Sequence, residues 1–171
     1  SYSSNEYAII GQVYESLFQY HYLKKPYQLE PLLASDMPTL QYFNAKGEAL
    51  TGKVDAKDIA FSDYTITVRQ EVRFQPHPSF NKSLHKVLPS DWDQRSLYDL
   101  PLATRLLTVD DFIYQIKRLA DPASQSPIAG LMANHIVGFE TFSQQQAQLL
   151  SDQPQLSKVQ RLQSVPLLGI K

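Results

Sequence analysis

One segment of the chain contains two histidines and two aspartates, whose side chains could together bind a metal ion. His77 and His85 are followed by Asp91 and Asp93, and imidazole nitrogens and carboxylate oxygens are ligands of zinc. Their spacing matches none of the established ligand patterns, and isolated motif matches are often false. We therefore interpret the histidines as solvated loop residues and expect no metal and no cofactor.

Other residues that could do chemistry have simpler explanations. Asp110 and Asp111 could be drawn as a catalytic pair, but neighbouring residues on a helix point in different directions. Carboxylates in the first turn cap a helix and favour the positive end of its dipole, which accounts for both. His135 lies near apolar residues and is expected to be a packing histidine. The sequence has no cysteine, no G-x-S-x-G turn and no phosphate loop, so it carries no motif for thiol, serine-hydrolase or phosphate-loop chemistry.

The amino-acid composition limits the classes of protein to which this chain could belong. The 171 residues carry a net charge of −1 and are 43% hydrophobic, which fits one globular domain and argues against a nucleic-acid partner. No apolar run is long enough to cross a bilayer, and no segment has the pattern of a secretory signal. If the protein is exported, we expect its signal sequence to lie outside this chain.

Two main helices are predicted from hydrophobic periodicity. Residues 107–122 indicate an amphipathic helix that Thr108 caps and Pro122 ends. An earlier helix begins with Ser3 and Glu6, which have the spacing of a capping box. Its apolar residues recur at helical spacing, so we expect one buried stripe formed by Ile9, Ile10, Val13, Tyr14, Leu17 and Phe18.

Shorter elements complete the predicted fold. Helical stretches are expected over residues 127–135 and 141–150, and strands over residues 37–43, 59–69 and 165–170. The second strand alternates, which indicates one wet face and one buried face containing Tyr64, Ile66 and Val68. Because a sheet with one solvated face is usually antiparallel, we predict an α+β fold with a small, mainly antiparallel sheet packed against several helices.

Two regions stand outside these elements. Residues 75–106 contain four prolines and the only tryptophan, and we interpret them as an irregular loop or insertion. Tyr20, Tyr22 and Tyr27 form the densest aromatic cluster of the chain. We expect them to pack in the core or against a neighbouring domain rather than to bind a ligand.

Four separated blocks resemble one protein family, in the order in which that family has them. Residues 107–122, LTVDDFIYQIKRLADP, are similar to the LTAEDFVYSxxRLADP segment of bacterial extracellular solute-binding proteins of family 5, the peptide and oligopeptide binders. The other blocks are residues 9–38, residues 64–74 (YTITVRQEVRF) and residues 136–142 (IVGFETF). Together the blocks span most of the chain outside residues 75–106.

The resemblance implies a receptor and not an enzyme. In this family the matching region is the smaller α+β subdomain of the first of two lobes, which close around a peptide or similar solute. The loaded protein then docks on the permease of an ABC importer in the membrane. Residues 1–171 are accordingly expected to be a single subdomain of a periplasmic protein or cell-surface lipoprotein, whose remaining lobes belong to the same polypeptide.

The sequence departs from the family pattern in ways that affect the ligand. Ser16 and Glu71 stand where the family usually has glycine. After the S-P pair, oligopeptide binders can carry a tyrosine that faces the peptide, and this position is Ile128 here. The turn formed by Ser126, Pro127 and Ile128 is our candidate for a ligand-lining edge, and helix initiation at Pro127 is its purely structural explanation.

Two further hypotheses stay open. Some transcriptional regulators fuse the same binding fold to a DNA-binding domain, so the chain could be the sensory domain of such a regulator. A self-contained hydrolase or metal enzyme using His77, His85 and the nearby aspartates is the third hypothesis. A signal peptide in the reading frame would exclude the regulator, and a metal analysis of the purified protein would test the metal enzyme.

Overall fold

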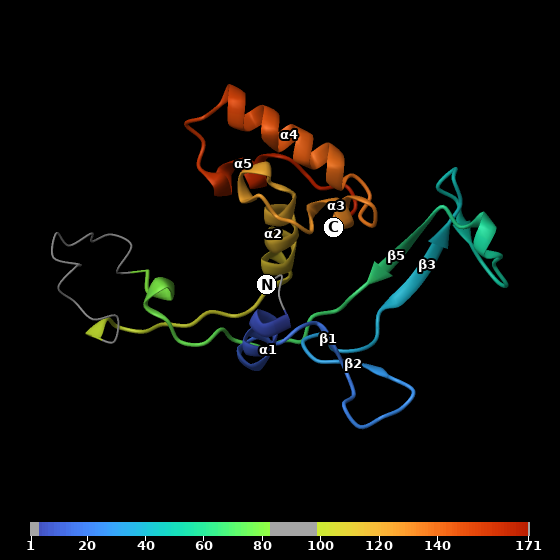
Figure 1. The fold of residues 1–171 in the computed structure, drawn as a ribbon, viewed down its shortest axis with the longest axis horizontal. Coiled ribbons are helices and arrows are strands. Elements are labelled where there is room, and N and C mark those ends of the chain that lie inside the picture. Colours follow the sequence, from blue (N-terminus) through green and yellow to red (C-terminus); the bar gives the residue numbers. More distant parts are fainter. Residues whose placement is uncertain (1–3, 83–98, 171) are drawn as a thin grey trace. The chain divides into compact units, whose positions relative to one another are not determined.

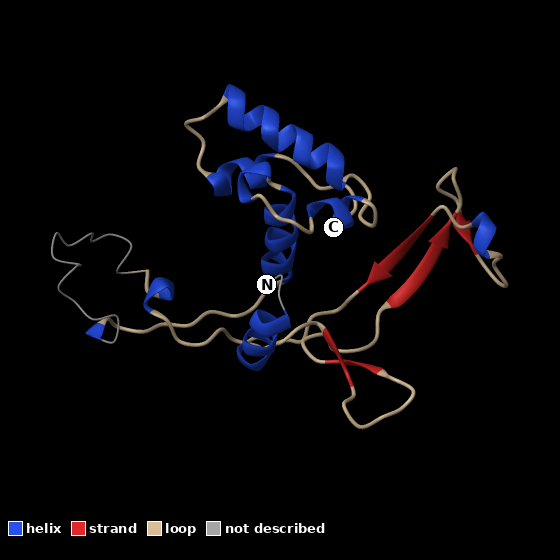
Figure 2. Cartoon of the chain, in the orientation of Figure 1, coloured by secondary structure: helices blue, strands red, loops and turns tan. Residues whose placement is uncertain are grey.

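A computed structural model describes residues 4–82 and 99–170 (Figure 1). The chain divides into two compact units, which comprise residues 3–106 and residues 107–171. Within the described residues there are five α-helices and two small antiparallel sheets, all strands lying in the first unit (Figure 2). The predicted α+β class with antiparallel pairing is therefore confirmed. None of the described helices is long and apolar enough to span a membrane.

The first unit begins with helix α1 (Ser4–Val13) and a short pair of strands, β1 (Phe18–Tyr20) and β2 (Leu29–Pro31). A three-stranded sheet follows in the order β4-β3-β5, formed by Ala49–Leu50, Thr39–Phe43 and Phe61–Thr65. The 3-10 turns η1 (Ala56–Asp58) and η2 (Pro78–Phe80) complete this unit.

The turn between β3 and β4 is determined by local chemistry. The side-chain oxygen of Asn44 accepts the backbone N–H groups of Lys46 and Glu48 at 2.9 and 3.0 Å. Gly47 adopts a φ of 80°, which glycine reaches without steric cost. Asparagine and glycine therefore close this hairpin as turn residues usually do.

The prediction of a continuous buried stripe on the first helix was wrong. The helix ends at Val13, and Phe18 lies in β1, where it pairs with Pro31 of β2. Pairing with a strand further along the chain thus overrides the helical spacing of these residues. Ile9 and Val13 are also largely exposed, at 69% and 64%. Ser3, the expected cap, lies outside the described residues.

The alternating strand prediction holds only in part. Strand β5 ends at Thr65, and Tyr64 is 59% exposed rather than buried. Beyond the strand, Val68 is half-buried and forms an isolated antiparallel bridge with Ala34. Ala34 and Leu33 are buried beside this bridge, and the stacked rings of Phe43 and Phe61 form a further apolar contact between β3 and β5.

The described ends of the 75–106 segment lie side by side. His77 pairs with Ala103, and Arg73 pairs with Leu106, in isolated antiparallel bridges. The guanidinium of Arg105 lies 4.4 Å from the centre of the Phe74 ring, a cation–π distance. The described ends, residues 75–82 and 99–106, form no α-helix and no strand, and these contacts join them. The prediction for the rest of the segment falls on residues 83–98, which lie outside the described residues.

The second unit is helical. Its elements are α2 (Val109–Ala120), the turn η6 (Pro122–Ser124), α3 (Ala129–Ala133), α4 (Phe139–Asp152) and α5 (Lys158–Ser164). The helices predicted after Pro127 and around residues 141–150 are thereby confirmed. Their apolar faces form one core, whose buried members are Ala120, Phe139, Phe142, Leu162 and Leu167.

Helix α2 begins and ends where the sequence predicts. The carboxylate of Asp111 accepts both the backbone N–H and the hydroxyl of Thr108, at 2.9 and 3.1 Å, which confirms the capping role. The helix ends at Ala120, and Asp121 is extended before Pro122, as expected for a residue that precedes proline.

The strand predicted over residues 165–170 is wrong. Helix α5 ends at Ser164, and the residues after it form no strand. Leu167 is 2% exposed within the helical core, and Pro166 has no N–H to donate to a ladder. Packing against the helices therefore decides the conformation of this β-favouring stretch.

Candidate functional site

A buried ion pair lies among the helices of the second unit. The Nη2 atom of Arg161, on α5, lies 3.4 Å from Oδ2 of Asp121, which follows α2. The Nη1 atom lies 3.5 Å from Oδ1, so the two planar groups face each other as a fork. Asp121 and Arg161 are only 1% and 3% exposed. A charge buried to this extent is normally found paired.

The carboxylate of Asp121 has two further partners. Its Oδ1 accepts the backbone N–H of Ala123 at 3.1 Å and so caps η6. The ammonium of Lys158 lies 3.5 Å from Oδ2 and donates to the Ser124 hydroxyl at 2.8 Å. Asp121 therefore joins the end of α2, the following turn and the start of α5.

Helix α4 contributes a buried amide to the same group of residues. Gln146, which is fully buried, donates from Nε2 to the backbone carbonyl of Arg161 at 3.1 Å. Two buried atoms of these residues have no hydrogen-bond partner in the described part of the chain, namely Oε1 of Gln146 and Nε of Arg161. We call Asp121, Gln146, Lys158 and Arg161 the charged cluster. Its contacts connect α2, α4 and α5, and none of its four residues lines the small pocket described next.

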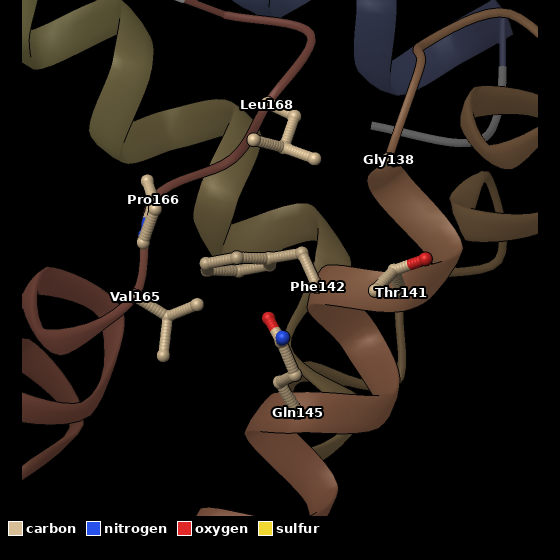
Figure 3. Close-up of a pocket in the computed structure, with 7 residues that line it drawn as sticks. All are labelled: Gly138, Thr141, Phe142, Gln145, Val165, Pro166 and Leu168. Atoms are coloured by element: carbon tan, nitrogen blue, oxygen red, sulfur yellow. The ribbon is translucent and has the colours of Figure 1, made fainter.

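A small pocket lies nearby in the same unit. It measures about 120 Å³ and lies between α4 and the segment after α5 (Figure 3). Figure 3 shows the Phe142 ring extending from α4 towards Pro166. Binding sites for drug-sized ligands measure about 300–1,000 Å³, so this pocket is too small for a peptide. Its lining residues, none of them charged, are Gly138, Thr141, Phe142, Gln145, Val165, Pro166 and Leu168.

The three predicted ligand-lining residues lie together in the turn before α3. The hydroxyl of Ser126 is buried and has no hydrogen-bond partner among the described residues. Pro127 is exposed and Ile128 is half-buried. The carbonyl of Ser126 accepts the N–H of Ala129 at 3.1 Å, so the turn also starts α3. None of the three lines the small pocket, and their role in binding stays a prediction.

Of the residues considered for a metal site, the structure describes His77. His85, Asp91 and Asp93 lie outside the described residues. The Nδ1 atom of His77 lies 2.8 Å from the Ser79 hydroxyl and accepts the Ser79 N–H at 3.1 Å. This contact resembles a serine–histidine pair, but it caps the turn η2. Within residues 4–82 and 99–170, no group of three or more His, Cys, Asp or Glu residues could hold a metal.

The expectation for His135 needs correction. Its side chain is exposed and does not pack in the core. The ring Nδ1 lies 2.8 Å from the carbonyl oxygen of Leu131, one helical turn earlier. A local contact with α3 therefore satisfies this histidine, although its apolar sequence neighbours favoured burial.

Sequence reasoning missed the charged cluster. Asp121 was seen only as part of the helix end, and α5 was not predicted. Ser157 and Gln160 have capping-box spacing, and the Gln160 side chain accepts the Ser157 N–H at 2.9 Å, so this helix start could have been found. The pairing of Asp121 with Arg161 had no local signal.

Comparisons with protein-family models, with curated proteins and with solved structures gave no match to this chain.

Proposed function

We propose that this chain is the small subdomain of the first lobe of a solute-binding receptor, which delivers a peptide or similar solute to an ABC-type importer. The observation that carries the proposal is the ordered resemblance of four blocks to solute-binding family 5. The structural limits of α2 support it, because the helix begins after Thr108 and ends before the Asp121-Pro122 pair. Residues 107–122, the most specific of the four blocks, begin and end at nearly the same positions.

The surface of the first unit also supports a place in a larger protein. Large apolar side chains are exposed on α1, at Tyr14 directly after it, and on β3 and β5, at fractions between 40% and 70%. Exposed apolar side chains favour a contact with another domain or protein where they form one patch. We propose that the remaining lobes of the same polypeptide cover the residues in question, namely Ile9, Val13, Tyr14, Leu40, Phe61 and Tyr64.

The proposed mechanism is binding without catalysis. Concave ligand sites form preferentially between domains, and the pocket of the second unit is too small for a peptide. We therefore place the working cleft between this subdomain and the remaining lobes, with the turn of Ser126, Pro127 and Ile128 at its edge. Closure of two lobes around the solute would trap it, in the periplasm or on a cell-surface lipoprotein.

Calorimetry of the intact polypeptide tests the proposal. We expect mixtures of short peptides to bind with a dissociation constant of about a micromolar or tighter, and residues 1–171 alone to bind far more weakly. Ile128→Ala should weaken binding several-fold. Leu131→Ala, at a site that is 58% exposed on the adjacent helix, is the matched control.

Three results would contradict parts of the proposal. Equal affinity of residues 1–171 and the intact polypeptide would refute the subdomain assignment. No binding of any peptide or small solute would refute the receptor. Binding that changes the affinity of the polypeptide for DNA, without uptake through an importer, would replace the transport role by the sensory domain of a regulator.

A further inference from the structure

Residues 20–27 run from the last residue of β1 towards β2 and combine exposed aromatic side chains with positive charge. We call these residues the tyrosine–lysine loop; in Figure 1 it extends beyond the two strands. Its tyrosines Tyr20, Tyr22 and Tyr27 are 67%, 88% and 74% exposed, and Leu23 is 71% exposed. The expectation that these tyrosines pack in the core of this chain was therefore wrong, and the other expectation, contact with a neighbouring domain, stays a prediction.

The loop has a defined internal structure. The His21 N–H donates to the Gln28 carbonyl at 2.8 Å, which extends the pairing of β1 and β2. The rings of Tyr20 and Tyr27 meet edge to face at 6.1 Å across the hairpin. The rings of His21 and Tyr22 are stacked, with centroids 6.0 Å apart. The aromatic groups are thus held in place while their outer surfaces stay exposed.

The charge of the loop is uniformly positive. Lys24 and Lys25 are exposed, and neither forms an ion pair with a described residue. Residues 16–29 contain no aspartate or glutamate. A surface that covers this loop should therefore be anionic, and it should accept both apolar rings and phenolic hydroxyls.

We propose that the tyrosine–lysine loop docks on the surface of an anionic lipid membrane. Tyrosine rings favour the boundary between headgroups and acyl chains, and lysine side chains can keep their ammonium groups among the lipid phosphates. Covering the same loop with protein would bury two lysine charges, which is costly unless each finds a partner. This surface is separate from the ligand edge of the proposed receptor and does not depend on it.

Vesicle binding by the intact polypeptide tests this inference. We expect co-sedimentation with vesicles of phosphatidylcholine and phosphatidylserine, and little with phosphatidylcholine alone. Replacing both lysines, Lys24→Gln with Lys25→Gln, should lower the partition coefficient roughly 25-fold, at about fivefold for each lysine near an anionic surface. Lys46→Gln with Lys53→Gln changes the net charge equally at exposed sites elsewhere in the first unit and should have little effect.

A fluorescent label distinguishes insertion from burial against protein. Residues 1–171 contain no cysteine, so Leu23→Cys gives a site for an environment-sensitive dye, with Ala45→Cys as the exposed control. We expect the emission of the first label alone to shift to the blue when anionic vesicles are added. A label that is already blue-shifted in buffer would show that the polypeptide covers the loop and would overturn the inference. An equal loss of vesicle binding in both double-lysine variants would overturn it as well.

Discussion

The guanidinium of Arg161 and the carboxylate of Asp121 form a buried ion pair between residues that are 40 positions apart in the sequence, with Nη2 and Oδ2 separated by 3.4 Å. The pair joins the segment after α2 to α5, and Gln146 adds α4 through its bond to the Arg161 carbonyl. The ion pair is a polar contact between distant parts of the helical unit, and we expect the stability of this unit to fall when either partner is removed alone.

Neutralising Asp121 should destabilise the protein strongly. Asp121→Asn keeps the shape of the side chain but leaves the Arg161 charge unpaired, and breaking a buried pair in this way costs about 3 kcal/mol in free energy of unfolding. Urea unfolding followed by circular dichroism measures the loss. Asp152→Asn, at an exposed helix end, is the control and should change stability by less than about 0.5 kcal/mol. A double-mutant cycle with Arg161→Met should give a clear coupling energy, and additive losses would disprove the pairing.

The two carboxylates at the start of α2 should differ in their contributions. Asp111→Ala removes the acceptor for both Thr108 groups and should lower the free energy of unfolding by about 1.5 kcal/mol. Asp110→Ala removes only a favourable charge at the helix start and should cost about 0.5 kcal/mol. Thermal unfolding of both variants checks the difference. Equal losses would contradict a specific capping role for Asp111.

Two glycines of the second unit should respond oppositely to alanine. A Cβ atom at Gly169 would clash with the backbone carbonyl oxygen of Val137, so Gly169→Ala forces the backbone to shift at a cost of about 2 kcal/mol. A Cβ at Gly130, inside α3, would meet nothing within 4 Å. Gly130→Ala should therefore stabilise the protein by about 0.5 kcal/mol through helix propensity. Unfolding by urea should show the opposite signs; a neutral Gly169→Ala would show that the last residues do not pack as described.

Two serines near the predicted ligand edge form another matched pair. Ser124→Ala removes the acceptor for the Lys158 ammonium and should cost about 1 kcal/mol. Ser126→Ala removes a buried hydroxyl without a partner among the described residues, so stability should stay equal or rise by up to about 1 kcal/mol. Differential scanning calorimetry of the two variants tests this. A large loss at Ser126 would reveal a hydrogen bond that involves residues outside the described part.

Local interactions made part of the fold predictable. Thr108 and Asp111 lie three residues apart and bond to each other, and Pro122 stops the helix by its own geometry, so α2 could be found from residues close in sequence. The resemblance to the solute-binding family rests on the same segment. The turn of Ser126, Pro127 and Ile128 could likewise be recognised as a helix start, although its ligand role stays a prediction.

Only the tertiary structure decided the rest, because the deciding partners are distant in sequence. Phe18 has helical spacing to the residues before it, yet pairing with Pro31 places it in a strand. Leu167 lies in a β-favouring stretch, yet the helical core buries it without strand pairing. The sequence alone does not distinguish Arg161 from an exposed surface arginine. Its burial against Asp121 arises from the packing of α2, α4 and α5, and no local pattern encodes that packing.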